Sequence, residues 1–186
     1  MIEVADFLPE NTYKQLKRYS LACEFKDAAN PIDGVTYPAI SIDIPEHIVA
    51  EVLSSIGQTL GFTPTDPIMF LRMSMEGEPC PHVHHHDLSH GTYSLMLYLN
   101  NDERGGTSLV RHGPSGCMYA PFDKDISAYI QSETNKLDRW VPYHKSNAVE
   151  NSAAIFDAGL MHRAEPVGGF GTSQDNARIV LTCFFS

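Results

Sequence analysis

A cluster of histidines beside an aspartate is the part of this sequence best suited to metal chemistry. Residues 81–90 hold five of the nine histidines of the chain, together with Asp87. In an extended chain alternate residues share a face, so His85 and Asp87 would present a nitrogen and a carboxylate oxygen to one ion. If the segment is not extended, His84 and His86 stay open as candidates. Composition alone also leaves open a solvated loop that binds metal non-specifically.

A third ligand must come from elsewhere in the chain, and His162 is the best candidate. It follows an apolar stretch at 153–156 and a turn that contains Gly159, which places it at the rim of a sheet. Two histidines and one carboxylate on one octahedral face leave three positions open, as non-haem Fe(II) chemistry requires. We therefore predict a metal centre of His85, Asp87 and His162.

The elements that must position these residues change in character along the chain. Pro9-Glu10 and Pro45-Glu46 each open a stretch with apolar residues at three- and four-residue spacing, and the second stretch ends at Gly61. This pattern predicts two helices. From residue 68 onward, short β-type runs are separated by turn residues. We expect strands at 107–111, 153–156 and 177–185, and a rim insertion at about 113–145 with a short helix near 126–132.

The run 92–100 predicts a strand whose two faces differ. Residues 93, 95, 97 and 99 are apolar, whereas Ser94, Met96 and Tyr98 fall on the opposite, more polar face. The apolar face suits packing beneath helices, and the polar face suits the lining of a pocket. We predict one α+β domain over 1–186, with helical support in 1–65 and a core in 68–186. The predicted core is a double-stranded β-helix, a jelly-roll or cupin-like barrel, with the N-terminal helices packed on one sheet.

Several landmarks occur in a characteristic order along the core. They are His85-His86-Asp87, Tyr98-Leu99-Asn100, Gly105-Gly106-Thr107, the run from Phe156 to Pro166 with His162, and then Arg178. In this order they resemble the 2-oxoglutarate/Fe(II)-dependent dioxygenase superfamily, most closely its prolyl-hydroxylase-like branch. The resemblance covers roughly residues 68–186.

The resemblance implies roles for two further residues. Arg178 matches the basic residue of the last core strand that holds the distal carboxylate of 2-oxoglutarate, and a guanidinium is suited to bind a carboxylate bidentately. An arginine at an exposed strand start is the alternative. Tyr98 matches a tyrosine that hydrogen-bonds the same carboxylate; an ordinary core tyrosine is its alternative.

The sequence departs from the family pattern at three places. The spacing of 16 residues from His162 to Arg178 is long, and we expect a flexible loop at 168–176 to absorb it. Val180 stands where many plant members carry a serine. Met73 and Met75 stand where prolyl hydroxylases carry a cosubstrate-binding tyrosine.

The resemblance implies an Fe(II)- and 2-oxoglutarate-dependent oxygenase that uses O2 and releases succinate and CO2. Hydroxylation of an unactivated C–H bond, in a small molecule or a peptide side chain, is the expected outcome. Arg111 and Arg72 are candidates for substrate contact, with a surface charge or a structural ion pair as the alternative. Trp140 and Tyr143 would belong to a lid or would pack the insertion onto the core. A 2-oxoglutarate-independent cupin-type metalloenzyme and a non-catalytic binding barrel are the competing functions.

The composition limits the classes of partner. With 13 Lys+Arg against 23 Asp+Glu, the formal net charge is −10, which disfavours binding to nucleic acid and to anionic membranes. No apolar stretch is long enough to span a bilayer, and the first residues lack the features of a secretory signal. The four scattered cysteines form no CxxC pair. We therefore expect reduced thiols and a cytoplasmic location.

Overall fold

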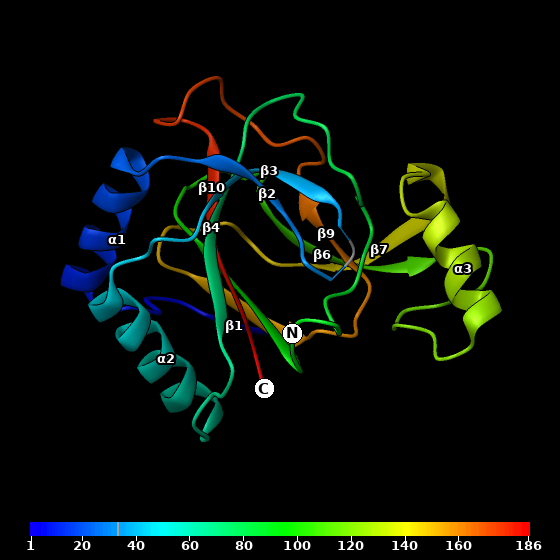
Figure 1. The fold of residues 1–186 in the computed structure, drawn as a ribbon, viewed down its shortest axis with the longest axis horizontal. Coiled ribbons are helices and arrows are strands. Elements are labelled where there is room, and N and C mark those ends of the chain that lie inside the picture. The colour runs from blue at the N-terminus through cyan, green and yellow to red at the C-terminus, as the bar shows by residue number, and fades with distance from the viewer. Residues whose placement is uncertain (33) are drawn as a thin grey trace.

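A computed structural model describes residues 1–32 and 34–186 and shows two antiparallel sheets with three α-helices (Figure 1). The helices are α1 (Glu10–Ala22), α2 (Glu46–Leu60) and α3 (Lys124–Glu133), and a short 3-10 helix, η1, covers Leu137–Arg139. The strands are β1 (Ile2–Val4), β2 (Lys26–Ala29), β3 (Thr36–Ser41), β4 (Ile68–Ser74), β5 (Tyr93–Tyr98), β6 (Gly106–His112), β7 (Trp140–Lys145), β8 (Ala153–Asp157), β9 (His162–Glu165) and β10 (Arg178–Phe185).

The larger sheet has seven strands in the order β1-β8-β5-β10-β4-β3-β2, and the smaller has three in the order β7-β6-β9. In the larger sheet, β10 lies between β5 and β4, so that Val180 pairs with Tyr98 on one side and with Arg72 on the other. In the smaller sheet, His162 pairs with Leu109. The arrangement is α+β, as the sequence predicts.

The first two helices begin where the sequence predicts, and the second also ends there. Pro9 and Pro45 stand at their N-caps, where a missing backbone N–H costs nothing. Gly61 ends α2 with a φ of 78°, a left-handed conformation that glycine adopts without strain. The short helix expected near 126–132 is α3, and the side chain of Asp123 caps it by accepting hydrogen bonds from the backbone N–H groups of Asp125 and Ile126.

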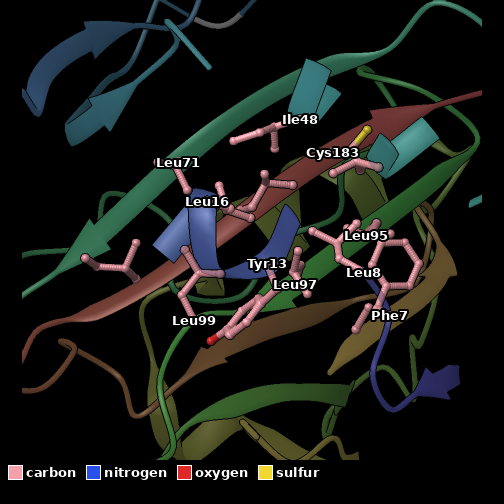
Figure 2. Packing of buried hydrophobic residues seen from close by; sticks show 14 of the residues in the cluster. Phe7, Leu8, Tyr13, Leu16, Ile48, Leu71, Leu95, Leu97, Leu99 and Cys183 are labelled. Atoms are coloured by element: carbon pink, nitrogen blue, oxygen red, sulfur yellow. The ribbon is translucent and has the colours of Figure 1, made fainter. Parts of the chain in front are cut away.

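Helices α1 and α2 pack on one face of the larger sheet, on the side of the molecule opposite α3 (Figure 1). Figure 2 shows Leu16 and Ile48 of the helices against Leu71, Leu95 and Leu97 of the sheet, and all five are almost fully buried. Burial of each such side chain contributes about 1.5–3 kcal/mol. The expected two-faced strand at 92–100 is confirmed, because its odd-numbered residues enter this core while Met96 lines a cavity on the other face.

Two parts of the sequence interpretation need correction. The first 65 residues are not only helical, because β1, β2 and β3 also extend the larger sheet. The end of the region 113–145 is not an insertion apart from the sheets, because β7 pairs with β6. Over the part of the chain that the structure describes, no helix is long and apolar enough to cross a membrane.

Candidate metal centre

His85, Asp87 and His162 lie together, with one ligand-type atom of each within 4.8 Å of the others. The two carboxylate oxygens of Asp87 each face one imidazole: Oδ1 lies 3.8 Å from His85 Nε2, and Oδ2 lies 3.2 Å from His162 Nε2. Among the described residues this is the one group of three such side chains close enough to hold an ion. It contains His85 and not His84 or His86, in agreement with the alternation argument.

Backbone pairing brings these distant residues together. His85 and His162 form an isolated antiparallel bridge, with hydrogen bonds of 3.0 and 2.9 Å in the two directions. The backbone N–H of Asp87 donates to the carbonyl of Ala158 at 2.7 Å. The segment around His85 is therefore extended only locally, over the residues that carry the ligands.

The ring nitrogens of the two histidines are arranged as metal ligands require. His162 Nδ1 lies 2.9 Å from the Leu160 carbonyl, and His85 Nδ1 lies 3.3 Å from the Val83 carbonyl. A proton on each Nδ1 leaves each Nε2 free to accept a metal. His162 Nε2 is buried 3.2 Å from Asp87 Oδ2 and has no hydrogen-bond partner among the described residues. A buried acceptor without a donor is costly, and a divalent cation would satisfy it.

The surroundings of His85 and Asp87 favour the forms of these two residues that bind metal. Burial, reinforced by His162, lowers the pKa of His85 to about 4, so this imidazole is neutral at pH 7. Burial alone would raise the pKa of Asp87, but the two histidines and Ser94 together hold it well below its usual range. Burial is the largest influence on His162 and would lower its pKa, but the Asp87 carboxylate and the Leu160 carbonyl together outweigh it and raise that pKa, so a metal ion on Nε2 would have to displace a proton.

Ser94 of β5 orients the carboxylate. Its hydroxyl donates to Asp87 Oδ2 at 3.0 Å, and both side chains are buried. Sequence reasoning placed Ser94 on the correct face of its strand but gave it no role. The alternation pattern was the signal that pointed to it.

A cavity of about 380 Å³ connects the three residues to Arg178. Arg178 is the first residue of β10, is only 6% exposed, and donates from Nε and Nη2 to the backbone carbonyls of Glu165 (3.1 Å) and Gly106 (3.3 Å). No carboxylate of the described residues forms an ion pair with its guanidinium. The alternative of an exposed arginine is therefore wrong. The cavity contains a buried guanidinium with further N–H groups that can donate to a ligand.

Tyr98 lies beside this cation but does not line the cavity. Its hydroxyl donates to Thr107 Oγ1 at 2.9 Å and lies 2.6 Å from Ser146 Oγ, and its side chain is 2% exposed. Burial raises the pKa of its phenol. Thr107 does line the cavity, so Tyr98 reaches it through that hydroxyl.

The two arginines considered for substrate contact differ in position. Arg72 lines the cavity, but Glu78, also in the lining, forms an ion pair with it at 2.9 Å. Arg111 is exposed on β6, where it pairs with Val141 of β7, and it is absent from the cavity lining. Arg72 is thus part of a structural ion pair and Arg111 is a surface charge, which are the alternatives that the sequence left open.

The region after β6 packs onto the metal segment rather than standing apart from it. Trp140 is buried with Val110, Ile130 and Met161, and its ring stacks on that of His84 with centroids 4.8 Å apart. Tyr143 is 44% exposed on β7. Of the two expectations for Trp140, packing onto the core is the one that the structure shows.

The loop at 168–176 is held at several points and is not a free connection. Glu76 N–H donates to the Gly171 carbonyl at 2.9 Å, and Gln174 Nε2 donates to carbonyls of Ser20 and Cys23 near the end of α1. Gly169 has a φ of 72°, and a Cβ there would lie 2.5 Å from the Ser74 carbonyl oxygen. These contacts fix the route by which the long spacing after His162 returns to Arg178.

No family model and no curated protein sequence matches the chain. Solved structures do share its fold. A prolyl-4-hydroxylase from Pseudomonas putida is 19% identical, with a TM-score of 0.54 over 99% of this chain and 90% of that chain. EvdO2 from Micromonospora carbonacea var. aurantiaca, solved with 2-oxoglutarate, is 15% identical, with a TM-score of 0.56 over 99% and 85%.

A third structure, a 2OG-Fe(II) oxygenase family oxidoreductase from Burkholderia pseudomallei, is 11% identical, with a TM-score of 0.57 over 100% of this chain and 84% of that chain. At such identities the likeness is one of fold. The fold of this chain is thus shared with structures of the 2-oxoglutarate/Fe(II) oxygenase superfamily, a prolyl 4-hydroxylase among them, in support of the resemblance seen in the sequence.

Proposed function

We propose that this protein is an Fe(II)- and 2-oxoglutarate-dependent oxygenase that hydroxylates an unactivated C–H bond and releases succinate and CO2. The proposed substrate is a small molecule or a peptide side chain. We also propose that the two sheets form the double-stranded β-helix, or jelly-roll barrel, of such enzymes. The likeness of fold to 2-oxoglutarate-dependent enzymes supports both proposals.

One observation carries the proposal: a facial set of ligand atoms and an unpaired buried arginine open into the same cavity. The set of His85, Asp87 and His162 suits Fe(II), because two imidazoles and one carboxylate leave coordination positions for other ligands. A cupin-type metalloenzyme without a cosubstrate has no need of Arg178. A buried guanidinium without an anion is costly, and the distal carboxylate of 2-oxoglutarate would compensate it.

The residues of the chain have separable roles in this scheme. His85, Asp87 and His162 would hold Fe(II), which supplies O2 activation coupled to oxidation of 2-oxoglutarate. Ser94 orients Asp87 by the hydrogen bond to Oδ2. Arg178 binds the far carboxylate of the cosubstrate, and Tyr98 fixes Thr107 at the wall beside it. The apolar lining around them limits water at the reacting centre.

Succinate formation in air tests the proposal. Purified protein with Fe(II) and 2-oxoglutarate is expected to release succinate slowly without added substrate. The Asp87→Ala variant is expected to release no more succinate than Fe(II) and 2-oxoglutarate form without protein. Arg178→Ala should require much more 2-oxoglutarate, whereas Arg111→Ala, an exposed arginine outside the cavity, should behave as the unmodified protein. Metal binding without succinate would reject the oxygenase and favour a non-catalytic binding protein. Full activity of Arg178→Ala would reject the anchor.

A further inference from the structure

The cavity extends beyond the space that the proposed cosubstrate requires. Arg178 lies at one end of β10 and Phe184 near the other, six residues apart, or about 20 Å along an extended strand. The metal centre reaches the cavity from the β5 side of β10, because Ser94 of β5 donates to Asp87. The lining continues across β10 onto β4 and β3, so 2-oxoglutarate bound between the metal and Arg178 would leave the end of the cavity over β4 and β3 free.

This free end, which we call the outer chamber, has an apolar lining. Its floor contains Phe70 and Phe184, with ring centroids 5.9 Å apart, and His90 stacks on Phe184 at 4.8 Å. Ile40 pairs with Arg72 at the inner edge of the wall, and Ile42 follows just beyond β3. Sequence reasoning missed this wall, although the alternation of Ile40, Ser41 and Ile42 is the pattern of a strand.

Apolar side chains at the mouth of the cavity are unusually exposed. Ile42 is 70% exposed, Ile32 is 53% exposed and Ile68 is 44% exposed, and all three belong to the lining. An exposed apolar group of this kind, next to a cavity, is typical of a ligand-binding surface. A bound apolar molecule would remove these side chains from water.

Each formally charged residue among the described lining residues already has an ion-pair partner or a role in the site. Arg72 and Glu78 neutralise each other, and Glu78 Oε2 also accepts from the Met75 N–H at 3.1 Å. Asp87 belongs to the metal centre, and Arg178 stands at the far end. A charged ligand group in the outer chamber would therefore lose hydration without gaining a counter-ion among these residues.

Because the wall is apolar and the charged lining residues already have partners or roles, we infer that the outer chamber binds an uncharged, largely apolar molecule. It sits against Phe70 and Phe184 and is closed in by Ile40 and Ile42. That this molecule is the substrate rests on the proposed oxygenase function. Apolar contacts, and not Arg72 or Arg111, would then recognise the substrate, since neither arginine offers an unpaired charge in the outer chamber.

Binding of a fluorescent, uncharged probe tests the inference. Phenylnaphthylamine is titrated anaerobically into the full chain loaded with Fe(II) and 2-oxoglutarate, and is then displaced by naphthalenemethanol, naphthoate or naphthylmethylammonium. These competitors share a ring system and differ in charge. The uncharged competitor is expected to bind at least about tenfold more tightly than either ion, because burial of an unpaired charge is costly. Equal or tighter binding of an ion, or no binding of the probe, would overturn the inference.

A matched pair of substitutions locates the probe. Ile42→Asp adds one negative charge at the mouth and should weaken probe binding at least about fivefold, or about 1 kcal/mol. Ile126→Asp adds the same charge at a 46% exposed isoleucine of α3, outside the cavity lining, and should leave binding unchanged. If both variants bind the probe equally well, the probe lies elsewhere and the inference fails.

The same experiment separates this inference from the proposed function. If the competitor ranking and the Ile42→Asp effect appear, but the protein with Fe(II) and 2-oxoglutarate forms no succinate in air, then the chamber is real and the oxygenase is rejected. If succinate forms but the ions compete as well as the uncharged molecule, the oxygenase function is supported and the apolar binding site is rejected.

Discussion

The side chain of Asn135 holds the backbone of Val83, two residues before the metal ligand His85. Val83 N–H donates to Asn135 Oδ1 at 2.9 Å, and Asn135 Nδ2 donates to the Pro81 carbonyl, also at 2.9 Å. The next residue, His84, places both its N–H (3.1 Å) and its Nδ1 (2.7 Å) on the Thr134 carbonyl. The turn that follows α3 therefore fixes the segment that delivers His85.

Asn135→Ala should weaken Fe(II) binding by about tenfold, because hydrogen bonds that orient a ligand contribute in this range. The two bonds are solvent-exposed, so the thermal stability of the metal-free protein should change little. Isothermal titration with Fe(II) under argon measures the affinity. Gln131→Ala, at the end of α3 just before this turn, is the control and should keep full affinity. Asn135→Asp, which keeps the acceptor for Val83 and loses the donor to Pro81, should be intermediate; unchanged affinity in Asn135→Ala would contradict the role of this contact.

Ser94→Ala should reduce metal affinity by several-fold, since the lost hydrogen bond to Asp87 is worth about 1 kcal/mol. The apparent Kd for 2-oxoglutarate, measured on protein saturated with Fe(II), should remain unchanged, because the Ser94 hydroxyl contacts Asp87 and not the proposed anchor Arg178. Ser94→Thr can keep the hydroxyl and is expected to restore most of the metal affinity. A loss of 2-oxoglutarate binding with intact metal binding would be inconsistent with this placement.

His85→Ala should abolish stoichiometric Fe(II) binding, whereas His84→Ala should retain a bound ion with weaker affinity. His84 is occupied by Thr134, by Arg163 Nη1 at 3.2 Å from its Nε2, and by the ring of Trp140, so it supports the site without entering it. Iron content after gel filtration distinguishes the two variants. The reverse result would show that His84 is the ligand.

Metal binding should stabilise the folded chain. At a concentration of one hundred times Kd, a divalent ion that binds only the native state adds about 2.7 kcal/mol, which raises the Tm of a domain of this size by about 5–10 °C. Differential scanning calorimetry with redox-stable Mn²⁺ measures the change. Asp87→Ala removes a ligand and should show no such increase, and an equal increase in that variant would place the ion elsewhere.

Much of the fold and of the site followed from local patterns. Proline and glycine marked the ends of α2, and the alternation of 92–100 separated the core face from the cavity face. The pairing of His85 with Asp87 followed from the same alternation, because the chain is extended at that point. These features depend on residues close in sequence, where the period of the backbone decides which side chains share a face.

Contacts between distant segments were beyond such reasoning. The strands β2 and β3 are short and form one side of the larger sheet, so only the pairing of β3 with β4 reveals that Ile40 faces a cavity. The Asn135 contact joins residues 52 positions apart. Arg72 looked available for substrate because nothing in the sequence shows that Glu78 folds back onto it.

Anaerobic titration of 2-oxoglutarate into the Fe(II)-loaded protein shows whether the metal centre and Arg178 bind one cosubstrate between them. Chelation of iron by the cosubstrate gives a weak visible charge-transfer band, which the unmodified protein should develop to saturation at one equivalent. Arg178→Ala should form the same band with about a hundredfold weaker affinity, because a charge-assisted anchor is lost, and His162→Ala should form none. A protein that binds Fe(II) yet develops no band with 2-oxoglutarate, or an Arg178→Ala variant with unchanged affinity, would contradict the account.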